Sequence, residues 1–105
     1  MAKSRKVQVF DRGGEYVAEP PVIDVAGSES VRIINHTDEE LLWRVSDPAP
    51  FGAAVSEVIP KKSGSTARSP VNTPGLVGVF AYQLIGLTSG KKAKGNSDPV
   101  IIVEN

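Results

Sequence analysis

Residues 74–86, P-G-L-V-G-V-F-A-Y-Q-L-I-G, form the longest apolar segment of this 105-residue chain. Phe80, Tyr82 and Leu84 recur at every second position, and the residues between them fall on the opposite side, which is the period of a β-strand. Valine and aromatic residues also suit a pleated, half-buried surface. At roughly 3.3 Å per residue, the segment is long enough to cross a small sandwich from end to end. It therefore predicts one central strand.

Short apolar runs separated by turn residues predict further strands along the rest of the chain. The first expected strand starts at Val7, and the others cover residues 15–19, 22–25, 30–36, 41–46, 65–69 and 100–103. A polar turn separates the strands at 30–36 and 41–46, so we expect these two to form a hairpin. Residues 52–59 are the one place where a helical turn is conceivable, because Ala53 and Ala54 tolerate helix.

This pattern of about eight short strands, with a turn signal roughly every 8 to 12 residues, is typical of an all-β, antiparallel sandwich or barrel. The length of 105 residues corresponds to one domain. We expect residues 1–6, which are polar and basic, to form a flexible lead-in, and residues 7–105 to form the domain.

The composition excludes several classes of function. The chain has no cysteine, which excludes a disulfide framework, a thiol nucleophile and a cysteine-ligated metal. Twelve basic and twelve acidic residues cancel, so no global charge favours nucleic acid or an anionic membrane as a partner.

The hydropathy of the chain bears on where the protein is found. No apolar run approaches the roughly 20 residues that span a bilayer. The N-terminus, M-A-K-S-R-K-V-Q-V-F, has a basic start but no apolar region behind it that would make a signal peptide. We expect a cytoplasmic protein on the chain as given, or a periplasmic or secreted one if a leader was removed.

Two of the strands carry motifs of a known family. Residues 31–35 read V-R-I-I-N, and residues 78–84 read G-V-F-A-Y-Q-L. They resemble the V-x-F-x-N and G-x-Y-x-Y-x-C strands of the cupredoxins, small β-sandwiches of the plastocyanin type. The resemblance covers the chain from about residue 22 to residue 103, and it implies an antiparallel Greek-key β-sandwich of about 7–8 strands.

The cupredoxin copper site needs two histidines, one cysteine thiolate and usually an axial methionine. The resemblance places the cysteine at Leu84, the second histidine near Leu87, and the first histidine within residues 41–43, where we favour Trp43. The methionine would lie in residues 88–97, which contain none. One histidine and no cysteine cannot hold type 1 copper, so we predict no cofactor and a former copper site that is either core or an apolar pocket.

The remaining polar residues give weaker signals. His36 would act as a base beside Asp38 or as a metal ligand, but a histidine beside a turn that bonds to backbone or solvent is the favoured interpretation. The acidic residues 38–40 lack the spacing of a calcium loop, and the lysines of residues 91–94 fit a solvated loop. Phe51, between Pro50 and Gly52, is a candidate for an exposed contact.

The leading functional prediction is a non-catalytic, copper-free, cupredoxin-like module for protein interaction or assembly, for which self-association is one route. The alternative is a small-molecule binding protein with an apolar pocket at the former copper site. An enzyme that uses His36 is the third hypothesis. The candidate contact or pocket residues are Trp43, Phe51, Tyr82, Leu84, Leu87 and His36.

Overall fold

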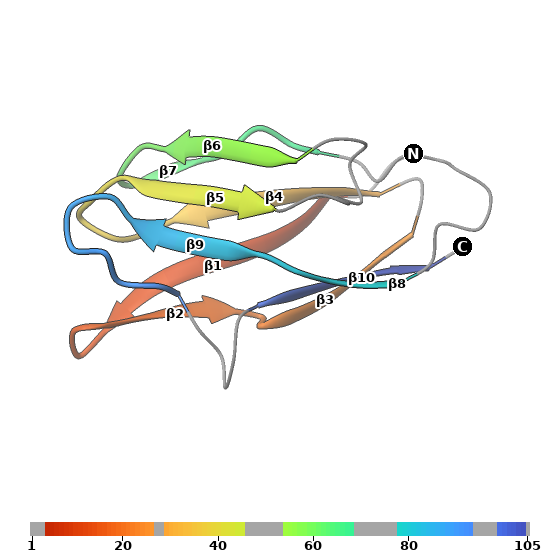
Figure 1. The fold of residues 1–105 in the computed structure, drawn as a ribbon, viewed down its shortest axis with the longest axis horizontal. Coiled ribbons are helices and arrows are strands. Elements are labelled where there is room, and N and C mark those ends of the chain that lie inside the picture. The colour runs from red at the N-terminus through yellow and green to blue at the C-terminus, as the bar shows by residue number, and fades with distance from the viewer. Residues whose placement is uncertain (1–3, 27–28, 46–53, 69–77, 94–98, 105) are drawn as a thin grey trace.

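The computed structural model describes residues 4–26, 29–45, 54–68, 78–93 and 99–104. These residues form ten strands and no helix (Figure 1). The strands are β1 (Ser4–Arg12), β2 (Glu15–Glu19), β3 (Val22–Ala26), β4 (Ser30–Asn35), β5 (Leu41–Val45), β6 (Val55–Ile59), β7 (Ser63–Gly64), β8 (Gly78–Ala81), β9 (Gln83–Gly86) and β10 (Val100–Glu104). No described segment is a helix long and apolar enough to cross a membrane.

The strands form three sheets around one core. Their orders are β2-β1-β4-β7, β3-β10-β8 and β6-β5-β9. Only Tyr82 separates β8 from β9, so the second and third sheets are linked along the chain. The inward side chains of all three sheets belong to one cluster of buried apolar residues, which is the core of a β-sandwich. The predicted all-β sandwich is confirmed.

The sheets are mixed rather than purely antiparallel. β1 pairs with β4 in parallel, and β10 pairs with β3 in parallel, while the remaining pairs are antiparallel. A parallel pair needs a crossover connection. Between β1 and β4 the chain passes through β3, which lies in another sheet. A two-residue period shows which side of a strand is buried but not which strand lies beside it.

The central strand predicted at 74–86 is interrupted, and its residues 74–77 lie outside the described part. β8 pairs with β10, whereas β9 pairs with β5, so the strand changes partners at Tyr82. There the backbone nitrogen of Tyr82 donates to the carbonyl of Pro99 at 3.0 Å. The predicted alternation is nevertheless correct, because Phe80 packs against the core and Tyr82 and Leu84 are buried.

Two predictions about neighbouring segments were wrong. The conceivable helical turn is strand β6, in which Val55 and Ile59 are buried and Val58 is exposed. The predicted hairpin does not form, because β4 lies between β1 and β7, whereas β5 lies between β6 and β9. The hairpin was wrong because β4 and β5 belong to different sheets, and the helical turn was wrong because the spacing of Val55 and Val58 fits a helix as well as a strand.

The strand boundaries also differ at two places. β1 begins at Ser4 rather than Val7, because Ser4, Arg5 and Lys6 pair with β4. Of the polar strand predicted at 65–69, Arg68 forms an isolated bridge with Val31, while the regular strand β7 lies just before it. The other expected strands are present within a residue or two of the predicted limits.

Candidate functional site

The inner side of β5 and β9 holds the residues that resemble copper-ligand positions. Trp43 on β5 lies opposite Leu84 on β9, and both are fully buried. The Arg68 guanidinium lies 5.7 Å from the Trp43 ring centroid, and it forms an ion pair with Glu57 at 3.0 Å. These side chains fill the space between the layers, and neither Trp43 nor Leu84 offers a group that would bind copper at this place.

Tyr82 lies on the same inner side and is 2% exposed. Its hydroxyl is buried and has no hydrogen-bond partner among the described residues, and this burial raises the pKa of the phenol. Leu87, which was predicted to share a pocket with Tyr82, is 49% exposed. The structure therefore separates the candidate residues into a buried group and an exposed one. Phe51 lies outside the described residues.

The connections after β4, β6 and β9 lie at the end of the molecule opposite the start of β1 and the end of β10 (Figure 1). Glu39 joins two of them. Tyr16 donates its hydroxyl hydrogen to Oε2 of Glu39, and the backbone nitrogens of Thr88 and Ser89 donate to Oε1 at 2.8 and 3.0 Å. The bond from Tyr16, followed by that from Ser89, lowers the pKa of Glu39 to about 2.

The space around Glu39 depends on Gly86. A Cβ at position 86 would lie 2.6 Å from Oε1 of Glu39, so no side chain fits there while Glu39 keeps its bonds. Sequence reasoning treated residues 38–40 as a solvated turn and missed this role of Glu39. Its partners lie 23, 49 and 50 positions away along the chain, so no local signal could have found it.

Asn35 fixes the chain between β4 and β5 from the inside. Its Nδ2 donates to the carbonyls of Glu39 at 2.8 Å and Pro60 at 3.1 Å, and its Oδ1 accepts from the nitrogen and hydroxyl of Thr37. Asn35 is fully buried, and these bonds satisfy both ends of its amide. The final Asn of the V-R-I-I-N motif therefore has a structural role.

His36 does not face the acidic residues. Its ring stacks on Phe10 with centroids 4.7 Å apart, and its Nε2 lies 3.0 Å from Oε1 of Gln8. Asp38, the predicted partner, instead lies 3.3 Å from the ammonium of Lys62. Among the described residues, the structure therefore does not bring together His36 and a carboxylate for acid–base chemistry.

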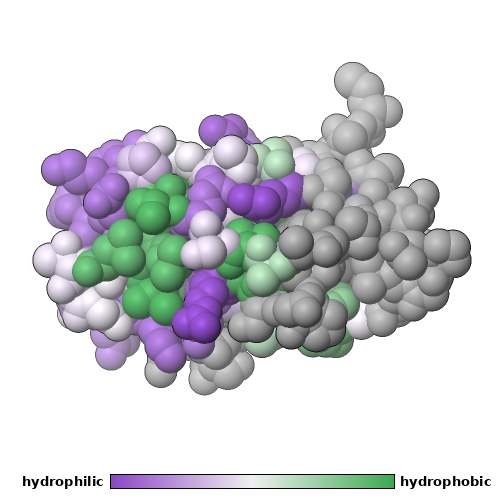
Figure 2. All heavy atoms as spheres, turned by 45° about the horizontal axis from the view of Figure 1, so that its top comes forward, coloured by the Kyte–Doolittle hydropathy of each residue, from purple (hydrophilic) through white to green (hydrophobic). Residues whose placement is uncertain are grey.

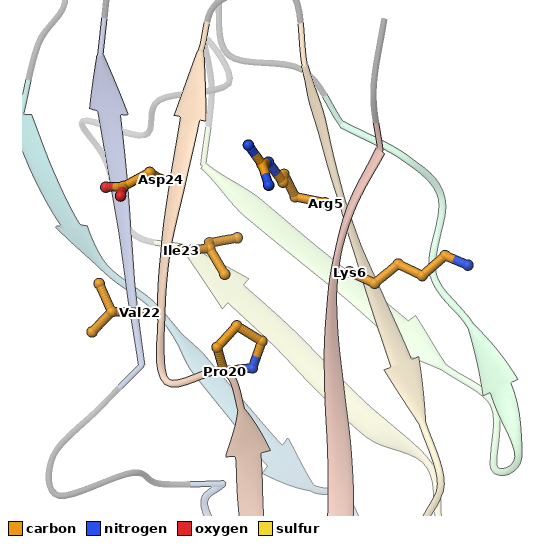
Figure 3. Close-up of a pocket in the computed structure, with 6 residues that line it drawn as sticks. All are labelled: Arg5, Lys6, Pro20, Val22, Ile23 and Asp24. Atoms are coloured by element: carbon orange, nitrogen blue, oxygen red, sulfur yellow. The ribbon is translucent and has the colours of Figure 1, made fainter.

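Two of the cavities formed by described residues lie outside the core. One, of about 400 Å³, is lined by Asp38, Glu39, Glu40, Pro60, Lys61 and Thr88. The other, of about 590 Å³, is lined by Arg5, Lys6, Pro20, Val22, Ile23 and Asp24. Figure 3 shows that Ile23 points into the gap between β3 and β1, whereas Val22 and Asp24 lie on the other side of β3. None of the candidate residues named from the sequence lines either cavity.

The outer side of sheet β6-β5-β9 carries exposed apolar residues. Val58, Leu42 and Ile85 occupy one row across the three strands, because Leu42 is opposite both of the others. Leu87 follows Ile85 by two positions, and its nitrogen bonds to the carbonyl of Glu40. Val58 is 48% exposed and Leu87 is 49% exposed. We call these four residues the apolar strip, and Figure 2 shows hydrophobic surface gathered over these strands.

Polar residues border the apolar strip on both sides. The next row toward the end of β5 consists of Ser56, Arg44 and Gln83. On the other side Glu40 is placed opposite Leu87, and Lys92 bridges to Ile85 at the free side of β9. An apolar centre with a charged rim is the usual anatomy of a protein–protein contact surface.

A second group of exposed apolar residues lies on sheet β3-β10-β8. Val79 is 68% exposed and Val22 is 51% exposed. Their register partners on β10 are Ile102 and Val100. On the apolar strip, Leu42 has a negative residue on one side of it along the chain and a positive residue on the other. No described strand of β3-β10-β8 has an apolar residue placed in this way.

The fold is that of a cupredoxin. The solved structures that resemble it include a Cu(I) form of an amicyanin mutant, with a TM-score of 0.65, 15% identity, and coverage of 99% of this chain and 85% of that chain. A reduced amicyanin mutant with tyrosine in place of tryptophan gives a TM-score of 0.63, 16% identity and the same coverage. No protein-family model and no curated protein matches the sequence. The likeness therefore shows a cupredoxin-like fold and confirms the resemblance on which the sequence prediction was based.

The residues of this chain do not fit the copper that the fold implies. The chain has no cysteine and one histidine, and Nε2 of that histidine is within hydrogen-bond distance of Gln8. In the described part of the chain, no three His, Asp or Glu side chains are grouped so that they could hold a metal ion. Copper chemistry therefore has no donor set here.

Proposed function

We propose that this protein is a non-catalytic, copper-free, cupredoxin-like module that binds another protein through the apolar strip. The observation that carries the proposal is the row of Val58, Leu42 and Ile85 on the solvent side of three adjacent strands. Exposed apolar residues that are scattered singly need no explanation, whereas a contiguous group with a polar rim is typical of an interaction surface.

The size of the strip sets the strength of the contact. Burying one aliphatic side chain completely stabilises by about 1.5 to 3 kcal/mol. Val58 and Leu87 are half-exposed, and Leu42 and Ile85 are already partly buried, so each has a fraction of that left to gain. Association itself costs about 4 to 15 kcal/mol. The strip therefore supports a weak, reversible contact in which the rim charges matter.

The state of the titratable side chains supports a non-catalytic role. Glu39 binds Tyr16 and two backbone nitrogens, and Glu57 binds Thr66 and Arg68, so both carboxylates hold loops together. His36, which the third hypothesis needs, has its ring against Phe10 and Gln8. These groups are occupied in structural bonds, and this holds also for Glu39, which lines the smaller cavity.

Among the residues that the structure describes, no observation favours the small-molecule alternative. Trp43, Tyr82 and Leu84 are buried in the core, and the two cavities have other linings. A ligand in such a pocket would change the fluorescence of Trp43, the sole tryptophan.

A photo-crosslinking experiment tests the proposal. A photoreactive amino acid replaces Val58 in the strip or, as a control, Glu15, which is exposed on β2 in the other layer. In extracts of the source cell we expect crosslinks to a specific protein from position 58 only, and we expect them to disappear when Leu42→Asp is added. Equal patterns from both positions, or none from position 58, would overturn the proposal.

A further inference from the structure

Two opposite charges, one on β5 and one on the residue just before it, lie at equal distances along the chain from Leu42, the centre of the apolar strip. Leu41, Trp43 and Val45 point inward and are buried. Glu40, Leu42 and Arg44 therefore lie on the outer side, and Glu40 and Arg44 are exposed. At roughly 3.3 Å per residue, each charge lies about 7 Å from Leu42 along the strand.

These two charges are free to pair with something outside the chain. They are about 13 Å apart, which is too far for an ion pair with each other. Neither side chain makes a hydrogen bond or an ion pair with another residue in the described parts of the chain. A partner that places a cation near Glu40 and an anion near Arg44 would complete both.

We propose that the partner is a second copy of this chain, packed face to face on the apolar strip about a two-fold axis that crosses β5 at Leu42. This inference rests on the proposed function and names the partner. In this arrangement β5 lies antiparallel over its own copy. Leu42 then meets Leu42 of the partner subunit, and Glu40 meets Arg44 of the partner subunit. The symmetry repeats the ion pair, so one interface contains it twice.

The charges select this arrangement over the other symmetric one. A two-fold axis parallel to β5 would also place the strips in contact, but it would set Glu40 against Glu40 of the partner subunit and Arg44 against the partner's Arg44. Opposed like charges are destabilising, and juxtaposed opposite charges fix the register of a contact. Packed sheets prefer strand directions within about 30° of each other, and the long Glu and Arg side chains can span that tilt.

The area of the strip predicts a weak dimer. Three strands spaced about 4.8 Å apart and five residues long cover roughly 230 Å². Stable interfaces bury about 800 Å² on each partner. We therefore expect a dimer with a dissociation constant of about 10 µM to 1 mM. On β3-β10-β8 the row through Val79 and Ile102 contains a single charged residue, Asp24, so no pair of opposite charges selects a register there, and we assign the contact to β6-β5-β9.

A charge-exchange experiment tests the arrangement. Sedimentation velocity is measured from about 10 µM to 1 mM on the original protein, on Glu40→Arg, on Arg44→Glu and on the double variant that exchanges the two charges. We expect each single variant to weaken the dimer by about tenfold or more, and the double variant to return within about threefold of the original affinity. Glu15→Arg, in the other layer, serves as the control and should leave the affinity unchanged.

The possible outcomes separate this inference from the proposed function. A monomer at all concentrations, or a dimer that the double variant does not restore, would overturn the inference. If position 58 crosslinks to a different protein while the purified chain stays monomeric, the proposed function holds and the second copy is excluded. If position 58 gives no crosslink and the chain is monomeric, both fail. Glu15, Glu40, Arg44 and Val58 are exposed and Leu42 is partly buried, and urea denaturation checks that each variant remains folded.

Discussion

Both sides of β5 and β9 carry apolar residues, but only those on the inner side are fully buried. On the inner side Trp43 lies opposite Leu84, and both are fully buried by the other layer. On the outer side Leu42 lies opposite Ile85, and both stay partly exposed. Strands with apolar residues on both sides are typical of sheets that are covered on both faces. The chain therefore covers the inner side itself, and the outer side is the surface on which we propose that a partner binds.

The largest expected effect on stability comes from a substitution on the buried, inner side of β5. Trp43→Ala should destabilise the fold by about 3 to 5 kcal/mol, because it leaves a cavity between the layers and removes the ring beneath Arg68. Leu42→Ala, one residue away on the outer side, should cost about 1 kcal/mol or less. Urea denaturation followed by circular dichroism measures both. Equal losses would mean that the outer side is as tightly packed as the inner one.

A second pair of substitutions applies the same contrast to two positions that resemble copper ligands. Leu84→Ala should cost about 2 to 5 kcal/mol, since Leu84 is fully buried. Leu87→Ala should cost about 0.5 kcal/mol, since Leu87 is half-exposed. Thermal unfolding compares the two. A large loss for Leu87→Ala would show that it packs against something other than solvent.

The inner side could be predicted from the sequence, and the strand neighbours could not. The alternation of Leu41, Trp43 and Val45 correctly identified the buried side of β5, because burial follows the two-residue period. The pairing of β5 with β6 and β9, rather than with β4, depends on contacts between distant parts of the chain. β6 was difficult because Val55 and Val58 fit a helical face as well as a strand.

The candidate site was only partly visible in the sequence. Trp43 and Leu84 were expected at the former copper site as core or as a pocket, and the structure places both in the core. The apolar strip was missed because Leu42 and Val58 form one apolar surface only when their strands are adjacent, and the sequence does not show this pairing. Glu39 was missed because its partners Tyr16, Thr88 and Ser89 are distant from it along the chain.

Glu39, in the connection between β4 and β5, provides a test with a smaller expected effect that depends on pH. Glu39 has a pKa of about 2 in the folded protein against 4.5 without its partners, so its contribution is complete above about pH 5 and disappears as the pH falls toward 2. Glu39→Gln should therefore lower the free energy of unfolding by about 1 to 2 kcal/mol at pH 7 and by progressively less below pH 5, because the carboxylate is partly exposed.

The difference in free energy between the original protein and Glu39→Gln isolates this carboxylate from the others. Urea denaturation at several pH values between 3 and 7 provides it. Glu15→Gln is the control, because Glu15 is exposed on β2 and lies outside the proposed dimer contact. Its difference from the original protein should stay near zero at every pH. A constant difference for Glu39→Gln down to the lowest pH would show that the carboxylate is not held in its charged form.

The smallest expected effect on stability belongs to the apolar strip. Val58 is half-exposed at the edge strand β6, so Val58→Ser should change the free energy of unfolding by about 0.5 kcal/mol or less. The same substitution should weaken self-association measurably, because it removes apolar area from both copies of a symmetric contact. Denaturation and sedimentation on one sample measure the two quantities. If Val58→Ser lowered the free energy of unfolding and left the affinity of self-association unchanged, Val58 would stabilise the fold and not the contact. The outer side of β5 would then not be the surface of association.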